Sequence, residues 1–161
     1  MFDASGEPRP IPSPPDRAIY TPHGGPPATG GIDRGLYERM GEPAIRRLTD
    51  DFYGRLARSS VVGRMFPADP KELVEAAGRT ADFFVFLFGG PPLYQQRWGR
   101  PMMRARHLPF VIDEAARAEW VRCFEGAAEE AVTRGDWSAQ DRDGVVAFLA
   151  AFSGWMVNSG P

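Results

Sequence analysis

The run Gly89-Gly90-Pro91-Pro92 divides the helical part of this 161-residue chain, because two glycines followed by two prolines cannot continue a helix. Further on, Pro101 and Pro109 bracket a segment long enough for about two helical turns. His107 lies in this segment among apolar residues and is one of 2 histidines in the chain. A short helix bounded by prolines could hold one axial metal ligand rigidly. The alternative is that His107 is an ordinary core or surface residue.

Two helices are expected before the glycine–proline stop. Pro43 suits the first turn of a helix, where its missing N–H has no partner to lose. The apolar face that follows it consists of Ile45, Leu48, Thr49, Phe52, Tyr53 and Leu56. The run Asp69-Pro70-Lys71-Glu72 supplies an N-cap, a proline at the first helical position and a glutamate three residues after the cap. The inward face of this second helix consists of Leu73, Ala76, Ala77, Thr80, Phe83, Phe84 and Leu87.

The second helix carries small side chains at Ala76 and Thr80 and large aromatic ones further along. Small residues let a neighbouring helix approach closely, or they leave room for a cavity. The sequence alone leaves both interpretations open.

Two more helices follow the His107 segment. Asp113 is placed to cap the first, and Gly135 to end it. Ser138 and Asp141 resemble a capping box at the start of the second. The two apolar faces consist of Trp120, Cys123, Phe124, Ala127, Ala128 and Ala131, and of Val145, Phe148, Leu149, Phe152, Trp155 and Met156. No segment alternates polar and apolar residues between turn signals, so the sequence predicts an all-α domain of four main helices.

Residues 1–35 differ from the rest, since they hold half of the chain's 16 prolines and few large apolar side chains. Such a segment cannot recover its ordering entropy by burial. We therefore expect an N-terminal arm over residues 1–35, mobile or draped, ahead of a domain over residues 36–161. Ile19 and Tyr20 could hold the arm against the domain or a partner subunit, and His23 is expected to be an exposed histidine of the arm.

Composition describes an ordinary soluble domain, with 43% apolar and 25% charged residues. A net charge of −2 gives no electrostatic case for nucleic acid or an anionic membrane. Cys123 is the single cysteine, which excludes an internal disulfide. The longest apolar run falls far short of the roughly 20 residues of a bilayer span, and no secretory signal is evident. We expect a cytoplasmic protein.

Six motifs over about residues 36–158 resemble those of group II truncated haemoglobins, in the order of that family. They are Asp51-Phe52-Tyr53, Met65-Phe66-Pro67, Gly89-Gly90-Pro91-Pro92-Leu93-Tyr94, Arg104-Ala105-Arg106-His107-Leu108-Pro109-Phe110, Glu119-Trp120-Val121-Arg122-Cys123 and Met156-Val157-Asn158. The resemblance implies a two-over-two helical sandwich that encloses haem b, with the arm outside it.

The resemblance also implies roles for polar residues. His107 matches the axial iron ligand, and Tyr53 and Trp120 match the polar side chains that stabilise a bound ligand on the opposite side of the haem. The chain is longer than the family pattern between Phe66 and Gly89, which makes the register of the intervening helix ambiguous. Counting back from Gly89 places Ala76 and Thr80 over the haem, with Thr80 as a third polar group.

Further haem contacts follow from family position. Arg79, Tyr94, Arg104 and Arg106 are expected near the haem propionates, with a solvated face as the alternative for the arginines. Phe66, Phe83, Phe84 and Phe110 are expected as apolar pocket residues, with plain core packing as the alternative. Arg100 stands where the family often has a histidine, so His107 has no competing ligand inside the domain.

The function implied first is binding of dioxygen and other diatomic ligands at haem iron. The alternative is a haem-based redox enzyme, active in nitric oxide dioxygenation or peroxidase-like turnover. Turnover of nitric oxide would need an external reductase, because the chain has no flavin or nicotinamide motif. A third function, from another class, is a helical interaction module that has lost haem. The resemblance leaves a homodimer open.

Overall fold

The computed structural model describes residues 11–28 and 31–160, and within this part of the chain all regular structure is helical. The elements are α1 (Leu36–Met40), α2 (Glu42–Arg58), the 3₁₀-helix η2 (Gly63–Met65), α3 (Pro70–Leu87), α4 (Leu93–Trp98), α5 (Met103–His107), α6 (Glu114–Thr133) and α7 (Ala139–Met156). The four long helices α2, α3, α6 and α7 confirm the all-α prediction. None of the described helices is long and apolar enough to cross a membrane.

Side-chain caps begin three of the long helices where the sequence predicts them. The Asp69 side chain accepts hydrogen bonds from the backbone N–H groups of Lys71 and Glu72, at 2.8 and 3.1 Å. Asp113 accepts from the N–H of Ala116 at 2.8 Å, and Ser138 Oγ accepts from that of Asp141 at 3.0 Å. Each cap satisfies a donor that the helix leaves without a partner.

Gly89 and Gly90 end α3 in a Schellman motif. The N–H of Gly90 donates to the carbonyl of Val85 at 2.8 Å, and that of Gly89 donates to Phe86 at 3.1 Å. Gly89 has φ of 98°, and a Cβ atom there would lie 1.8 Å from the carbonyl oxygen of Arg34. Only glycine fits this position.

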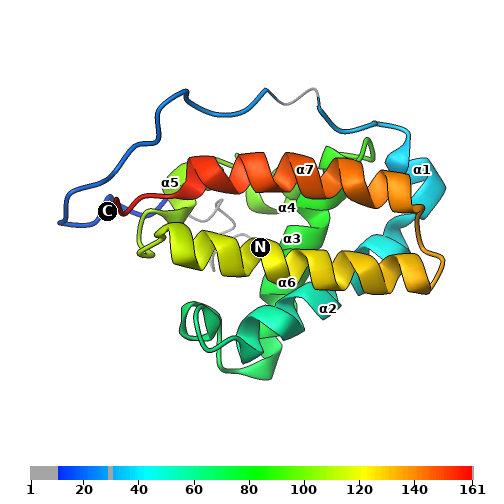
Figure 1. Cartoon of the computed structure of the whole chain (residues 1–161), viewed down its shortest axis with the longest axis horizontal. Helices are drawn as coiled ribbons and strands as arrows, with labels where there is room; N and C mark the ends of the chain where they lie inside the picture. Colours follow the sequence, from blue (N-terminus) through cyan, green and yellow to red (C-terminus); the bar gives the residue numbers. More distant parts are fainter. Residues whose placement is uncertain (1–10, 29–30, 161) are drawn as a thin grey trace.

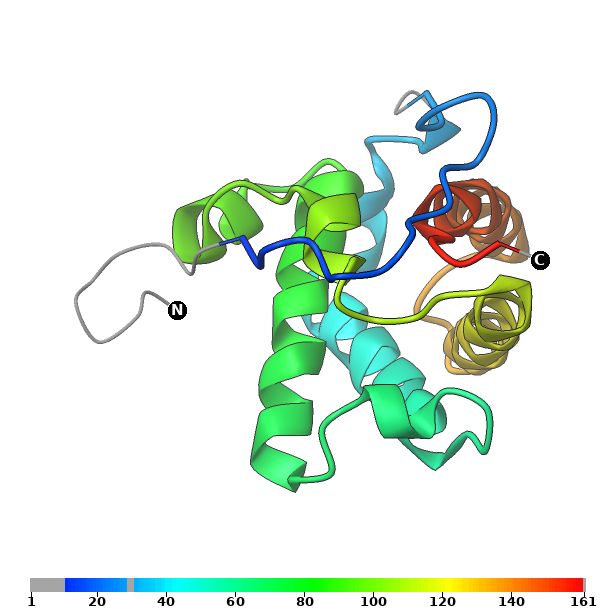
Figure 2. The same cartoon turned by 90° about the vertical axis from the view of Figure 1, so that its left-hand side faces the viewer.

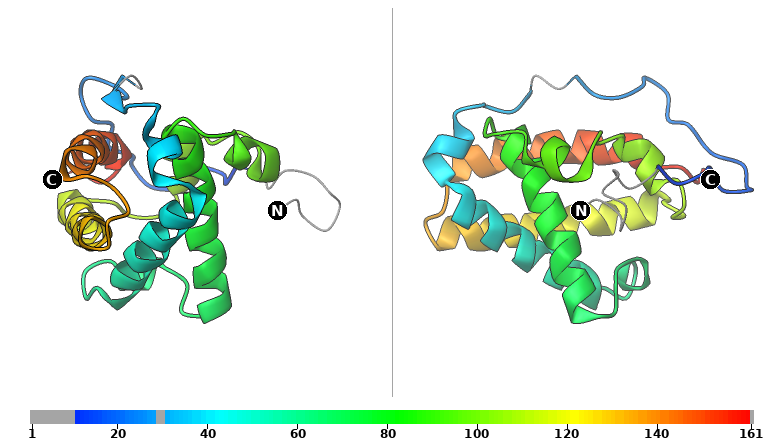
Figure 3. Two further views of the ribbon diagram at one scale, coloured as in Figure 1. Left: turned by 90° about the vertical axis from the view of Figure 1, so that its right-hand side faces the viewer. Right: turned by 180° about the vertical axis from the view of Figure 1, so that it is seen from behind.

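The long helices form two antiparallel pairs that cross each other. Helices α6 and α7 run side by side along the molecule, and α2 and α3 pack as the second pair across them (Figures 1 and 2). Both further views show the same crossing (Figure 3). Four aromatic rings of the core are fully buried. Phe52, Phe84 and Phe124 lie on α2, α3 and α6, and Phe88 directly follows α3.

Two short helices lie between α3 and α6. Helix α4 is not predicted from the sequence, because six residues between Pro92 and Gly99 are too few to show an apolar period. Helix α5 is shorter than the expected two turns and covers only Met103–His107. Met102, which precedes it, has the left-handed φ of 40°, so the chain turns sharply into α5.

Residues 11–28 of the expected arm begin beside α5 and run back along α7 towards α1 (Figure 1). The N–H of Tyr20 donates to the carbonyl of Asn158 at 3.0 Å, which ties this segment to the end of the chain. Residues 1–10 of the arm lie outside the described residues. The division of the chain into residues 1–35 and 36–161 stays a prediction.

Candidate functional site

A cavity of about 570 Å³ lies beside the core, with walls from α2 to α7. Its volume falls in the range of about 300–1,000 Å³ that is usual for cofactor and ligand sites. Among its lining residues are eleven expected at the site: Tyr53, Phe66, Ala76, Arg79, Thr80, Phe83, Tyr94, Arg106, His107, Phe110 and Trp120. Phe84 lines it as well. The fold thus gathers the expected residues other than Arg104 around one space.

His107 is the last residue of α5 and contributes to the cavity wall. Its Nδ1 lies 2.6 Å from the carbonyl oxygen of Met103, one helical turn earlier. Because a carbonyl can only accept, Nδ1 carries the hydrogen and Nε2 keeps its lone pair. Burial lowers the pKa of His107, which favours the neutral imidazole. A neutral, oriented imidazole is the form that ligates a metal ion.

Tyr53 on α2 and Thr80 on α3 form a hydroxyl pair, with Oη and Oγ1 2.6 Å apart. Burial raises the pKa of Tyr53, so the phenol keeps its proton at neutral pH. The rings of Phe52 and Phe66 pack edge-on against Tyr53, at centroid distances of 5.8 and 5.6 Å. Packing on both sides fixes the phenol at the cavity wall.

Trp120 on α6 brings an indole to the same cavity. Its ring packs edge-on against Phe52 at 5.1 Å and stacks on Phe124 at 6.3 Å. The indole N–H groups of Trp98 and Trp137 donate to Asp82 and to the carbonyl of Ala128. No such acceptor faces the indole N–H of Trp120 among the residues that the structure describes. Its donor is therefore available to a molecule in the cavity.

Cationic groups line the cavity from α3 and α5. The guanidinium of Arg79 stacks on Trp98 at 4.8 Å, and its buried Nε has no hydrogen-bond partner in the described part of the chain. Arg106 donates through Nε and Nη2 to the carbonyls of Pro101 and Arg100, at 3.0 and 3.1 Å. These cations suit the acidic groups of a bound cofactor.

Arg104 is not among the lining residues of the cavity, and its contact with the haem propionates stays a prediction. Its guanidinium stacks on Trp155 at 4.6 Å and donates to the carbonyls of Val157 and Tyr20, at 3.0 and 2.7 Å. Residues two apart on a helix do not face the same side, so Arg104 and Arg106 cannot both face the cavity. Arg104 instead binds the end of α7 and the arm.

Several lining residues were missed from the sequence, among them Met103, Arg117 and Ser153. Arg117 precedes Trp120 by three residues and Met103 precedes His107 by four, so helical spacing could have found both. Arg117 donates through Nη2 to the carbonyl of Ala150 at 2.7 Å. Its buried Nε has no hydrogen-bond partner among the described side chains and backbone groups.

The family model for bacterial-like globins matches residues 35–158 of the chain. The group 2 truncated haemoglobin YjbI of Bacillus subtilis (strain 168) is 38% identical over 100 residues, which are 62% of this chain and 74% of that protein. The chain belongs to the group II truncated haemoglobins.

Solved structures agree with this family. Phosphate-bound Hell's gate globin IV is 30% identical and has a TM-score of 0.77, covering 84% of this chain and 81% of that one. The truncated oxygen-avid haemoglobin of Bacillus subtilis is 34% identical with a TM-score of 0.69, covering 76% of this chain and 98% of that one. The crossed helix pairs are thus the two-over-two globin fold.

Membership of this globin family implies a haem cofactor and the binding of diatomic gases such as dioxygen. The residues of the cavity fit a haem group. They combine an apolar lining with one imidazole lone pair at His107 and an unpartnered buried guanidinium nitrogen at Arg79.

Proposed function

We propose that this truncated haemoglobin holds haem b through Nε2 of His107 and retains dioxygen tightly with hydrogen bonds from Trp120 and Tyr53. One observation carries the proposal: one cavity has an imidazole of fixed tautomer in its wall and two ring-packed donors, Tyr53 and Trp120, from other helices. His107 lies on α5, whereas Tyr53 and Trp120 lie on α2 and α6.

Haem iron, when bound, supplies the position at which a diatomic gas is coordinated. The chain's contribution begins with the hydrogen bond between Nδ1 of His107 and the carbonyl of Met103. This bond sets the ring rotation and makes Nε2 the better electron donor. Arg79, Arg106 and Tyr94 would hold the acidic edge of the porphyrin, and Phe66, Ala76, Phe83 and Phe110 would enclose its apolar part.

Trp120 and Tyr53 would act on a ligand in the other half of the cavity. The indole N–H can only donate, so Trp120 favours a ligand that carries partial negative charge. Thr80 Oγ1 can donate to Tyr53 Oη, which leaves the phenol hydrogen for the ligand. Each such bond would add about 1.5–3 kcal/mol to ligand retention. Slow release suits redox chemistry or gas sensing better than oxygen delivery.

One similar protein supports tight binding, since the Bacillus subtilis structure is described as an oxygen-avid haemoglobin. The proposal is tested on protein reconstituted with haem b. Absorption spectra are recorded for the ferric form, the ferrous form and the ferrous form under air, and stopped flow then gives the dioxygen release rate. A stable oxygenated spectrum with slow release supports the proposal. Fast release would refute the roles of Tyr53 and Trp120, and the absence of any haem spectrum would refute the proposal as a whole.

A further inference from the structure

Arg17 of the N-terminal arm binds the backbone that directly follows His107. Its Nη2 donates to the carbonyl oxygens of Leu108 and Phe110, at 3.0 and 2.9 Å. Its Nη1 donates to the carbonyl of Asn158 at 3.1 Å, and Nη2 also lies 2.8 Å from Oδ1 of the same residue. One guanidinium from a distant part of the sequence therefore joins the arm, the turn after α5 and the end of the chain.

Asn158 links Arg17 to His107 through hydrogen bonds. Its side chain is fully buried, and Nδ2 donates to the carbonyl oxygen of His107 at 3.2 Å. Its Oδ1 accepts from the N–H of Ile112 at 3.1 Å, and its own N–H donates to the carbonyl of Ile112 at 2.9 Å. The turn between α5 and α6 is thus held from both ends by Asn158, against which Arg17 lies.

A second connection joins the arm to α5 three residues further along. Arg104 donates to the carbonyl of Tyr20 at 2.7 Å, and the N–H of Tyr20 donates to the carbonyl of Asn158 at 3.0 Å. Arg104 also stacks on Trp155 at 4.6 Å. The arm is therefore fixed at two points, at Arg104 within α5 and at the turn that follows α5.

Helix α5 needs such support, because a five-residue helix has little stability of its own. A guanidinium is suited to the task, since its planar, charged donors reach several converging carbonyls at once. The family match begins at residue 35, so Arg17 lies outside the matched part of the chain.

We propose that Arg17 is a positioning residue for His107. By binding the carbonyls of Leu108 and Phe110, it fixes the turn that directly follows His107, and with it the angle of the imidazole in the cavity. This inference rests on the proposed role of His107 as the haem ligand.

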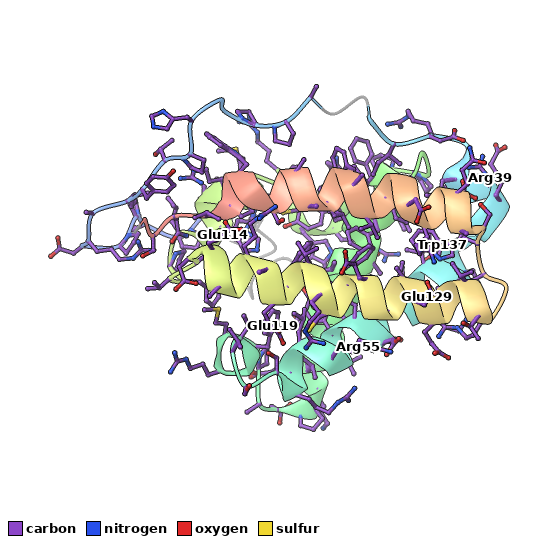
Figure 4. The ribbon with its side chains drawn as sticks, in the orientation of Figure 1. Arg39, Arg55, Glu114, Glu119, Glu129 and Trp137 are labelled. Atoms are coloured by element: carbon purple, nitrogen blue, oxygen red, sulfur yellow. The ribbon has the colours of Figure 1, made fainter. Side chains whose placement is uncertain are left out.

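The test compares Arg17→Gln with Arg39→Gln in the full-length chain. Glutamine at position 17 removes the charge and the forked donor from a half-buried site that should tolerate it. Arg39 also joins distant segments through its guanidinium, which pairs with the carboxylates of Asp33 and Asp141 at 2.9 and 2.6 Å. It lies at the opposite end of the molecule from α5 (Figures 1 and 4).

Two readouts are used. In haem-free protein, hydrogen exchange of the Phe110 and Ile112 amides should accelerate about 10- to 100-fold in Arg17→Gln, because charge-assisted hydrogen bonds to this turn are lost. In ferrous haem-loaded protein, the iron–histidine stretching band in the resonance Raman spectrum should shift and broaden. Arg39→Gln should change neither.

Unchanged amide exchange in Arg17→Gln would refute the claim that Arg17 stabilises the turn after α5. An unchanged iron–histidine band would refute its role in positioning His107. Equal effects in Arg39→Gln would overturn both, since they would report a general loss of stability. If the unsubstituted protein binds haem without any iron–histidine band, the role of His107 as ligand fails instead. The exchange data would then test only whether Arg17 stabilises the turn after α5.

Discussion

Trp120→Phe is expected to speed the release of dioxygen strongly. The substitution removes the indole N–H and keeps a ring that can still pack against Phe52 and Phe124, which lie 5.1 and 6.3 Å from the Trp120 ring. A hydrogen bond to a partly charged acceptor contributes about 1.5–3 kcal/mol, so its loss should raise the release rate about 10- to 150-fold. Stopped flow on the oxygenated protein, with carbon monoxide or dithionite to trap the product, measures this rate.

Trp137→Phe is the matched control. It also removes a buried indole donor, which binds the carbonyl of Ala128 at 3.0 Å. Trp137 lies near the opposite end of α6 from Glu114 and does not line the cavity (Figure 4). Its replacement should lower stability and leave the release rate within about twofold of the unsubstituted protein. A release rate that is unchanged in Trp120→Phe, or that changes equally in both variants, would refute the role of Trp120.

Further substitutions test three other parts of the structure. Tyr53→Phe should speed dioxygen release in stopped flow, and Thr80→Val should do so less, because it removes only the orienting partner of Tyr53; slower release in Thr80→Val would contradict this. Arg122 and Ser59 lower the pKa of Glu119 from 4.5 to about 2, so folding favours the carboxylate and its stabilisation is lost as pH falls from 4.5 towards 2. Glu119→Gln should therefore make the melting temperature less dependent on pH in that window. An unchanged pH dependence of the melting temperature would contradict the stabilising role of Glu119. Asp82→Asn should lower the urea-derived free energy of unfolding by about 1–3 kcal/mol, since this buried carboxylate accepts from Arg46, Arg97 and Trp98. As the control, Glu129→Gln on the surface should lower it by less than about 0.5 kcal/mol.

The long helices could be predicted because their signals are local. Asp69, Asp113 and Ser138 cap their helices through backbone groups two or three residues away, and the apolar faces repeat within each helix. The same helical spacing put Tyr53, Thr80 and Trp120 on inward faces. These faces line one cavity because of the way the helix pairs cross. The family resemblance implies this crossing, whereas helical spacing does not predict it.

The contacts around α5 could not be predicted in the same way. Arg17 reaches carbonyls about 90 positions away, and a carbonyl acceptor leaves no mark on the sequence, because every residue has one. Arg104 is expected near the haem propionates only if the short helix follows the porphyrin edge. On a helix of five residues, the tertiary partners Trp155 and Tyr20 decide its direction.

The central claim, that His107 holds the haem, is tested most directly by comparing the two histidines of the chain. His107→Ala and His23→Ala are purified, reconstituted with haem b and passed over a desalting column. Haem retained per chain is then measured by absorption. The account predicts that His23→Ala keeps one haem per chain and that His107→Ala loses it. Full haem retention by His107→Ala, with an unchanged ferrous spectrum, would contradict the account.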